Sequence, residues 1–293
     1  MRPPPVETAN PHSVRSLLRV LCAAALTLWH PGVALAQSAK SEHVIAPAIA
    51  SNGNTDRGLA LMNAFRDSLP SHSGNRLRCT SCHLDNGTRP NAMPWLGSAA
   101  RYPRYRGRRG GEESLAQRVN DCITRSLAGR PLPESGRDMR DMLAYLGTLN
   151  GTRPIGPDTV KLMGSERAGR PLYTTECARC HGGAGAGLVA PAVWGRDSYS
   201  IGAGLARQTV LATFVSLNMP HDKSGSLTAQ QSADIAAFVL AQPRQDHPGK
   251  EADWPKGDPP NDVAYSTRAA KAAGKPMPLA RPLLPRRIHP RTP

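Results

Sequence analysis

Aromatic residues are scarce in this sequence. They make up 4% of the 293 residues, and only three of them are Phe. The length is sufficient for two small domains, but so few aromatic side chains are a thin supply for two hydrophobic cores. No segment alternates between apolar and polar residues as a strand would, so we predict a mainly α fold with long loops.

Long apolar runs are also missing, and the one short run has the features of an export signal. Arg15 and Arg19 precede apolar residues 20–28, and Ala34-Leu35-Ala36 is a small-x-small cleavage site. The run is too short to span a bilayer, although an uncleaved anchor is the alternative. We therefore predict that residues 1–36 are a cleaved signal peptide. The mature protein would be periplasmic, without a transmembrane span.

Four of the six cysteines form two identical motifs, Cys79-Thr80-Ser81-Cys82-His83 and Cys177-Ala178-Arg179-Cys180-His181. C-x-x-C-H is the attachment sequence of c-type haem: the thiols form thioethers to the porphyrin, and the His binds iron. A zinc site built from the thiols is the alternative, but it gives the two His no reason to follow the cysteines directly. We predict two covalently bound c-type haems, whose porphyrins would supply much of the missing apolar surface. The attachment residues are Cys79, Cys82, Cys177 and Cys180, and the iron ligands include His83 and His181.

The charge balance is strongly basic, with 37 Lys and Arg against 22 Asp and Glu and a formal net charge of +15. Removing residues 1–36, with three Arg and one Glu, leaves +13. Nucleic acid is one common partner of such proteins, but it does not suit an exported haem protein. Small anions or an acidic redox partner fit better.

The two motifs define a loose internal repeat, in which an amphipathic helix precedes each motif and a closing helix ends each half. The segment 150–157 holds two Pro and two Gly and is interpreted as a linker. The chain is thus expected to consist of two tandem cytochrome c-type domains and an irregular tail rich in Pro and basic residues. The predicted segments are the signal peptide 1–36, an N-terminal domain 37–150, a C-terminal domain 151–243 and the tail 244–293.

Met219 is the candidate distal ligand of the second haem. It lies in Asn218-Met219-Pro220, where the Pro keeps the preceding backbone out of a helix. Two alternatives stay open: Met219 could fill space in the core, and His221 could be the ligand. His/Met ligation raises the reduction potential of a haem.

The first haem has no equivalent loop, since Met93-Pro94 comes only ten residues after His83. Cys122, which is unpaired, lies instead on the apolar face of a predicted helix over Ser114–Leu127. It could be a buried small hydrophobe. As a thiolate ligand of the first iron, it would be electron-donating and hold that haem at a lower potential.

A dense basic segment precedes this helix. It is either a solvated loop or an oxyanion site, because paired guanidinium donors bind oxyanions such as those of low-valent sulfur. Arg118 stands one turn before Cys122 and points the same way as its thiol. The basic residues are Arg101, Arg104, Arg106, Arg108 and Arg109, and Arg125 and Ser126 follow Cys122 within about a turn.

The residues from Pro94 to Arg108, together with Leu115-x-x-Arg118-Val119-Asn120-x-Cys122-x-x-Arg125-Ser126-x-x-Gly129, resemble the dihaem cytochrome c thiosulfate dehydrogenase family. The resemblance covers roughly 54–265. It implies a catalytic first haem with His/Cys ligation and a second, electron-transfer haem with His/Met ligation. It implies Cys122, Arg108, Arg118 and Ser126 as catalytic residues. Some members carry a Lys directly before the Met, where this chain has Asn218, which puts a Lys ligand switch in doubt.

The resemblance implies an enzyme that couples two thiosulfates into tetrathionate, reversibly in some members, and passes two electrons to an external redox protein. Two other functions stay open. One is an electron-transfer cytochrome without a substrate of its own, and the other is a sulfur-oxidation haem subunit that loads thiosulfate onto a carrier protein. A dihaem peroxidase ranks third, because it requires an open iron site.

Overall fold

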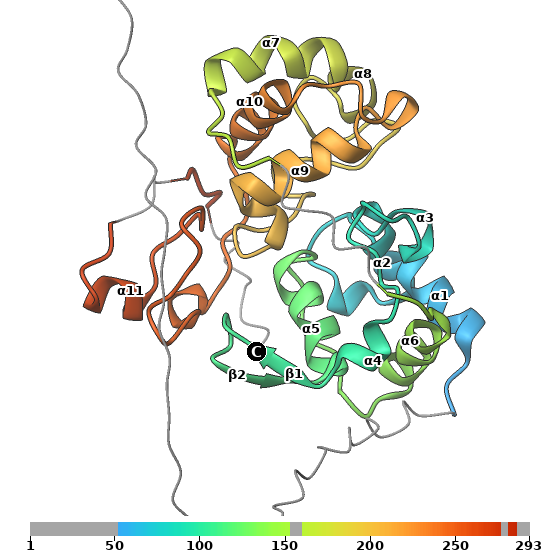
Figure 1. Cartoon of the computed structure of the whole chain (residues 1–293). Coiled ribbons are helices and arrows are strands. Elements are labelled where there is room, and N and C mark those ends of the chain that lie inside the picture. The colour runs from blue at the N-terminus through green and yellow to red at the C-terminus, as the bar shows by residue number, and fades with distance from the viewer. Residues whose placement is uncertain (1–51, 153–159, 277–280, 286–293) are drawn as a thin grey trace, which may run out of the picture. The chain divides into compact units, whose positions relative to one another are not determined.

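Each half of the chain is built on a helix before the C-x-x-C-H motif that packs against a helix after it (Figure 1). The computed structural model describes residues 52–152, 160–276 and 281–285. All of them belong to one compact unit, Ile45–Pro293. The predicted signal peptide and most of the predicted linker lie outside the described residues.

The described residues are mainly helical, as predicted. The first half contains α1 (Thr55–Asn63), α2 (Phe65–Ser68), α3 (Leu84–Gly87), α4 (Ser98–Arg101), β1 (Arg104–Arg106), β2 (Gly111–Glu113), α5 (Leu115–Arg125) and α6 (Arg137–Thr148). The second half contains α7 (Glu166–Glu176), α8 (Ala178–His181), α9 (Gln208–Asn218) and α10 (Ala229–Leu240), and α11 (Arg268–Ala272) follows in the tail. Within this part of the chain, no helix is both long and apolar enough to cross a membrane.

The same helix crossing occurs in both halves. A Cβ on Gly58 of α1 would lie 2.0 Å from the carbonyl oxygen of Asp141 in α6, and one on Gly169 of α7 would lie 1.9 Å from that of Asp234 in α10. The Asp141 side chain also accepts a hydrogen bond, at 2.8 Å, from the backbone N–H of Asn54, which caps α1. The Asp234 side chain likewise accepts one, at 2.7 Å, from the backbone N–H of Ser165, which caps α7. The backbones therefore touch at the crossing, which only glycine allows.

The helix that carries Cys122 begins where the sequence predicts. The Ser114 side chain accepts from the backbone of Gln117, and the Gln117 side chain accepts from the backbone of Ser114, which completes a capping box. Thr228 and Gln231 form the same box at the start of α10. These local signals fix the N-termini of both helices.

The basic segment before α5 forms a short hairpin, which the sequence did not reveal. β1 pairs antiparallel with β2, and Arg104 lies opposite Glu113. Each strand has three residues, too few to show alternation. The hairpin anchors one end of the arginine segment beside α5.

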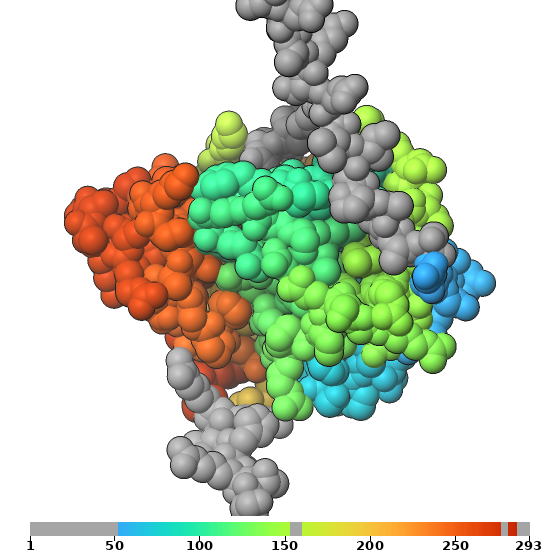
Figure 2. Space-filling model, turned by 90° about the horizontal axis from the view of Figure 1, so that it is seen from below, coloured from blue at the N-terminus to red at the C-terminus, as the bar shows by residue number. Residues whose placement is uncertain are grey.

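The described part of the tail is largely irregular, as predicted, and it packs against the first half. Trp254 and Tyr265 are buried in a small cluster with Ile201, and Figure 2 shows the orange and red tail residues packed on the green residues of the first half. Asp253 receives two hydrogen bonds from Arg125 of α5, at 2.8 Å and 2.7 Å, and one from the Tyr265 hydroxyl at 2.5 Å. The tail thus holds the end of α5 that follows Cys122.

His247 is a further tail residue buried at this contact. The ring lies so close to Gly202 that a Cβ there would be 2.6 Å from it. Burial, aided by the charge of Arg125, lowers the pKa of His247 to about 4. The imidazole is therefore neutral at neutral pH, and His247 places no further positive charge beside Arg108 and Arg125.

We predict that Gly169→Ala lowers the free energy of unfolding of the holoprotein by about 1–3 kcal/mol, because the added methyl forces α7 and α10 apart. Urea unfolding followed by circular dichroism measures this. The matched control is Gly147→Ala in α6, where a Cβ meets no atom within 4 Å. That substitution should leave stability unchanged or raise it by up to about 1 kcal/mol. Equal effects of the two substitutions would contradict the crossing.

We also predict that Asp253→Asn destabilises the protein by about 3 kcal/mol, because the mostly buried Arg125 guanidinium loses its close carboxylate partner and keeps only the more distant Asp121, at 3.8 Å, among the described residues. The control is Asp222→Asn, which breaks a similar bidentate pair with Arg179 at 2.6 Å and 2.7 Å. Side chains of that pair are about half exposed, at 49% and 59%, so its loss should have a much smaller effect. If the two variants unfold at the same urea concentration, the tail does not anchor α5.

Candidate active site

The two motif histidines are held in the same way. His83 Nδ1 lies 2.5 Å from the carbonyl oxygen of Met93, and His181 Nδ1 lies 2.7 Å from that of Pro191, each ten residues further along the chain. A carbonyl only accepts hydrogen bonds, so Nδ1 carries the hydrogen and Nε2 is the unprotonated nitrogen. This is the tautomer that an iron ligand requires, with a carbonyl partner that orients the ring.

A glycine and a tryptophan support each motif. Gly87 and Gly185 both follow the motif histidine by four residues and have positive φ angles of 79° and 60°. A Cβ on Gly87 would lie 2.0 Å from the Trp95 ring, and one on Gly185 would lie 2.2 Å from the Trp194 ring. The Trp95 ring in turn lies 4.8 Å from that of His83, centroid to centroid. In each half, the glycine that follows the motif thus packs directly against a tryptophan ring.

Each motif also opens into a cavity that contains its predicted distal ligand. The first cavity, about 260 Å³, is lined by Cys79, Cys82, His83 and Cys122 among others. The second, about 620 Å³, is lined by Cys177, Cys180, His181 and Met219 among others. Attachment cysteines, an oriented imidazole and a sulfur ligand therefore line each cavity, and these residues fit a c-type haem.

Met219 and His221 both line the second cavity, but they differ in burial. Met219 ends α9 in an extended conformation and packs against the core, whereas His221 is exposed. Asn218, directly before Met219, is fully buried and donates from Nδ2 to the carbonyl of Asn91 at 3.0 Å. Asn218 thus ties the ligand loop to the first half of the chain.

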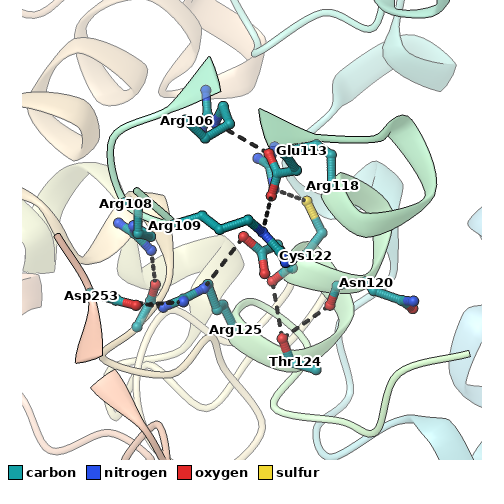
Figure 3. A network of polar contacts seen from close by, with 12 residues as sticks. Arg106, Arg108, Arg109, Glu113, Arg118, Asn120, Cys122, Thr124, Arg125 and Asp253 are labelled. Atoms are coloured by element: carbon teal, nitrogen blue, oxygen red, sulfur yellow. Dashed lines mark hydrogen bonds and ion pairs between the residues drawn. The ribbon is translucent and has the colours of Figure 1, made fainter. Parts of the chain in front are cut away.

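Arg118 and Cys122 meet in the first cavity. They lie one turn apart on α5, and Arg118 Nη1 donates to Cys122 Sγ at 3.1 Å (Figure 3). A negative charge on this sulfur raises the pKa of Arg118 by more than burial lowers it. Ser126 also lines this cavity. The helix therefore places a sulfur, a guanidinium and a hydroxyl on one face.

Three arginines of the predicted basic segment, to which the family resemblance assigns no role, line the same cavity: Arg101, Arg104 and Arg106. Arg106 Nε lies 3.3 Å from a carboxylate oxygen of Glu113, which is buried (Figure 3). Arg109 Nε lies 3.9 Å from the other oxygen. Burial raises the pKa of Glu113. Arg104 and Arg106 share one face of β1 because they are two residues apart in a strand, and no pattern in the sequence indicated that strand.

Arg108, in contrast, is not among the residues that line the first cavity. Its Nη1 donates to the carbonyl of Gly202 at 2.6 Å, and its guanidinium lies 4.6 Å from the centre of the Trp254 ring. Burial lowers the pKa of Arg108. The guanidinium joins the hairpin to the second half and the tail, so its predicted contact with substrate would require it to leave these partners.

Comparisons with known proteins agree with this geometry. Residues 71–155 match the family model described as SoxA/TsdA, cytochrome c domain, and residues 164–239 match that described as cytochrome c oxidase, cbb3-type, subunit III. The chain is 38% identical to a thiosulfate dehydrogenase of Psychrobacter arcticus, over 71% of this chain and 68% of the relative. It is 35% identical to one of Allochromatium vinosum, over 64% and 77%.

A solved structure is also similar: thiosulfate dehydrogenase (TsdBA) from Marichromatium purpuratum, with a TM-score of 0.59 and 29% identity. The match covers 67% of this chain and 47% of the solved chain, so this chain spans less than half of that protein. The chain contains two cytochrome c domains, each with an oriented C-x-x-C-H histidine. It is also similar to the two relatives over most of their length. The chain belongs to the thiosulfate dehydrogenase family of c-type cytochromes.

Proposed function

We propose that this protein oxidises thiosulfate, couples two molecules into tetrathionate, and passes the two electrons to an external redox protein. The observation that carries the proposal is the contact of Arg118 Nη1 with Cys122 Sγ inside the cavity that holds the first C-x-x-C-H motif. An electron-transfer cytochrome has no use for a guanidinium-paired sulfur there. The names of the relatives supply the substrate, and the cavity chemistry suits it.

Electrostatic repulsion is the main obstacle to this reaction. Two thiosulfate dianions must approach each other and a thiolate, and charges of one sign repel strongly in a partly buried site. Four guanidinium groups line the cavity and offset part of this charge, and guanidinium donors suit the oxyanion end of thiosulfate. They are those of Arg101, Arg104, Arg106 and Arg118. Arg106 is also paired with Glu113, and Arg101 also donates to the carbonyl of Leu96 and to Ser98.

Cys122 supplies the nucleophilic sulfur. Its thiolate and the outer sulfur of one thiosulfate form an S–S bond, which gives Cys–S–S–SO₃⁻ and releases two electrons. The second thiosulfate attacks the outer sulfur of this adduct, tetrathionate leaves, and the thiolate of Cys122 is restored. No proton is gained or lost. The haems, when bound, accept the electrons one at a time, which is the chemistry that the protein side chains do not supply.

The two halves have different tasks in this scheme. We propose that residues 37–150 hold the catalytic haem, with His83 and Cys122 as ligands, and that residues 151–243 hold the electron-transfer haem, with His181 and Met219. Two motifs with two matching cavities support a count of two haems. We propose that the reaction takes place in the periplasm, because residues 1–36 have the features of an export signal.

We expect Cys122→Gly to abolish thiosulfate-dependent haem reduction, by at least about a thousandfold, because the nucleophile is lost. The haems should remain attached, because the four motif cysteines are unchanged, and pyridine haemochrome spectra count them. Dithionite should still reduce both haems in the variant. Thiosulfate oxidation at the wild-type rate would exclude the mechanism. Turnover by the purified chain alone also separates it from a subunit that needs a carrier protein.

We expect Arg118→Ala to lower kcat/KM for thiosulfate by about 10- to 100-fold, because one charge-assisted contact to the dianion is lost. Arg118→Lys should recover only part of the rate, since Lys keeps the charge but not the paired donors. The control is Arg137→Ala in α6, whose side chain is 73% exposed. An unchanged thiosulfate dependence in Arg118→Ala would remove this residue from the site.

A further inference from the structure

A third cavity, about 790 Å³, lies where the two halves of the chain meet. It is lined by residues 63–67, 76–78 and 81 of the first half and by residues 186–192 of the second. Leu77 and Arg78 line this groove and both haem cavities, and Val189 lines the groove and the second cavity. The groove is therefore separated from the second C-x-x-C-H motif by single side chains.

Two apolar side chains stand exposed in this groove. Leu188 is 74% exposed and Val189 is 82% exposed, although both follow the second motif within ten residues. Neighbouring apolar residues that remain in water next to a cofactor cavity are typical of a surface that a partner covers. A small dianion gains nothing from such side chains, so the groove does not suit a second thiosulfate.

Three exposed arginines surround the apolar pair: Arg66, Arg76 and Arg78. None of them forms an ion pair with another described residue, and Asp67 is the only acidic residue in the lining. Other arginines of the described chain, such as Arg57 and Arg179, bind carboxylates. An apolar centre with a rim of uncompensated positive charge is complementary to a protein with an acidic rim.

We propose that this groove is the docking site of a small acidic electron-carrier protein, which receives electrons from the second haem. The proposal rests on the proposed function, in which electrons leave the protein through that haem. Each carrier accepts one electron, so two carriers are reduced for every tetrathionate formed. The shared wall at Val189 gives the carrier close access, and the arginines steer it there.

The test uses the holoprotein and plant plastocyanin, a small copper protein with an acidic patch. The holoprotein is reduced with dithionite, freed of the excess and mixed with oxidised plastocyanin in a stopped-flow instrument. Calorimetric titration with the redox-inert cadmium form of plastocyanin measures binding without electron transfer. The groove variant is Arg66→Glu/Arg76→Glu, which leaves Arg78 unchanged because that residue also lines both haem cavities. The control is Arg167→Glu/Lys271→Glu, which changes the net charge equally at exposed residues outside the groove.

The wild type should bind at low ionic strength and lose affinity as salt screens the charges. The groove variant should weaken binding and slow the second-order reduction of plastocyanin by at least about tenfold, and the control by less than about twofold. Leu188→Ser/Val189→Ser should weaken binding at every salt concentration. Absence of wild-type binding, an unaffected groove variant, or an equal loss in the control would each overturn the docking site.

Failure of this proposal is distinguishable from failure of the proposed function. Dithionite supplies the electrons, so the result does not depend on thiosulfate. If thiosulfate reduces the haems but the groove substitutions do not change plastocyanin binding, the docking site is wrong and the proposed function is unaffected. If the groove binds plastocyanin but thiosulfate reduces neither haem, the groove stands and the proposed reaction is wrong.

Discussion

The helical spacing of α5 is the constraint on which the site depends. Arg118, Cys122 and Ser126 follow one another at intervals of four residues, so they share one face, and all three line the first cavity. Arg125 lies three residues after Cys122 and turns to the tail, where it binds Asp253. One short helix thus presents the sulfur that is proposed to react, and Arg125 on the same helix binds it to the tail.

That arrangement concentrates positive charge, which the fold must tolerate. Buried Glu113 pairs with Arg106 and Arg109, and Asp253 pairs with Arg125, so part of the charge is compensated within the protein. Among the described residues, Arg118 donates a side-chain hydrogen bond to the sulfur of Cys122, while Glu113 and Asp121 act on it through their charge. A bound anion could accept from the other guanidinium N–H groups, so the proposed substrate fits the electrostatics of this site.

Local signals in the sequence were sufficient for much of this structure. The C-x-x-C-H motifs, the capping boxes at Ser114 and Thr228 and the pairing of Arg118 with Cys122 each involve residues within a few positions of one another. The anchoring of the tail could not be foreseen in this way, because Arg125 and Asp253 are 128 positions apart. The hairpin was missed because its strands are too short for periodicity, and the Gly58 and Gly169 crossings depend on backbones that meet only in the folded chain.

The internal repeat shows where the two halves have diverged. Both keep the histidine bound to a carbonyl ten residues later, the glycine against a tryptophan, and the glycine crossing capped by an aspartate. They differ on the opposite side of the cavity, where α5 brings Cys122 and α9 ends at Met219. On the proposed ligand sets, thiolate favours a low potential and thioether a high one. Electrons would therefore run downhill from the half that holds Cys122 to the half that holds Met219, and the difference between these two distal residues favours that direction.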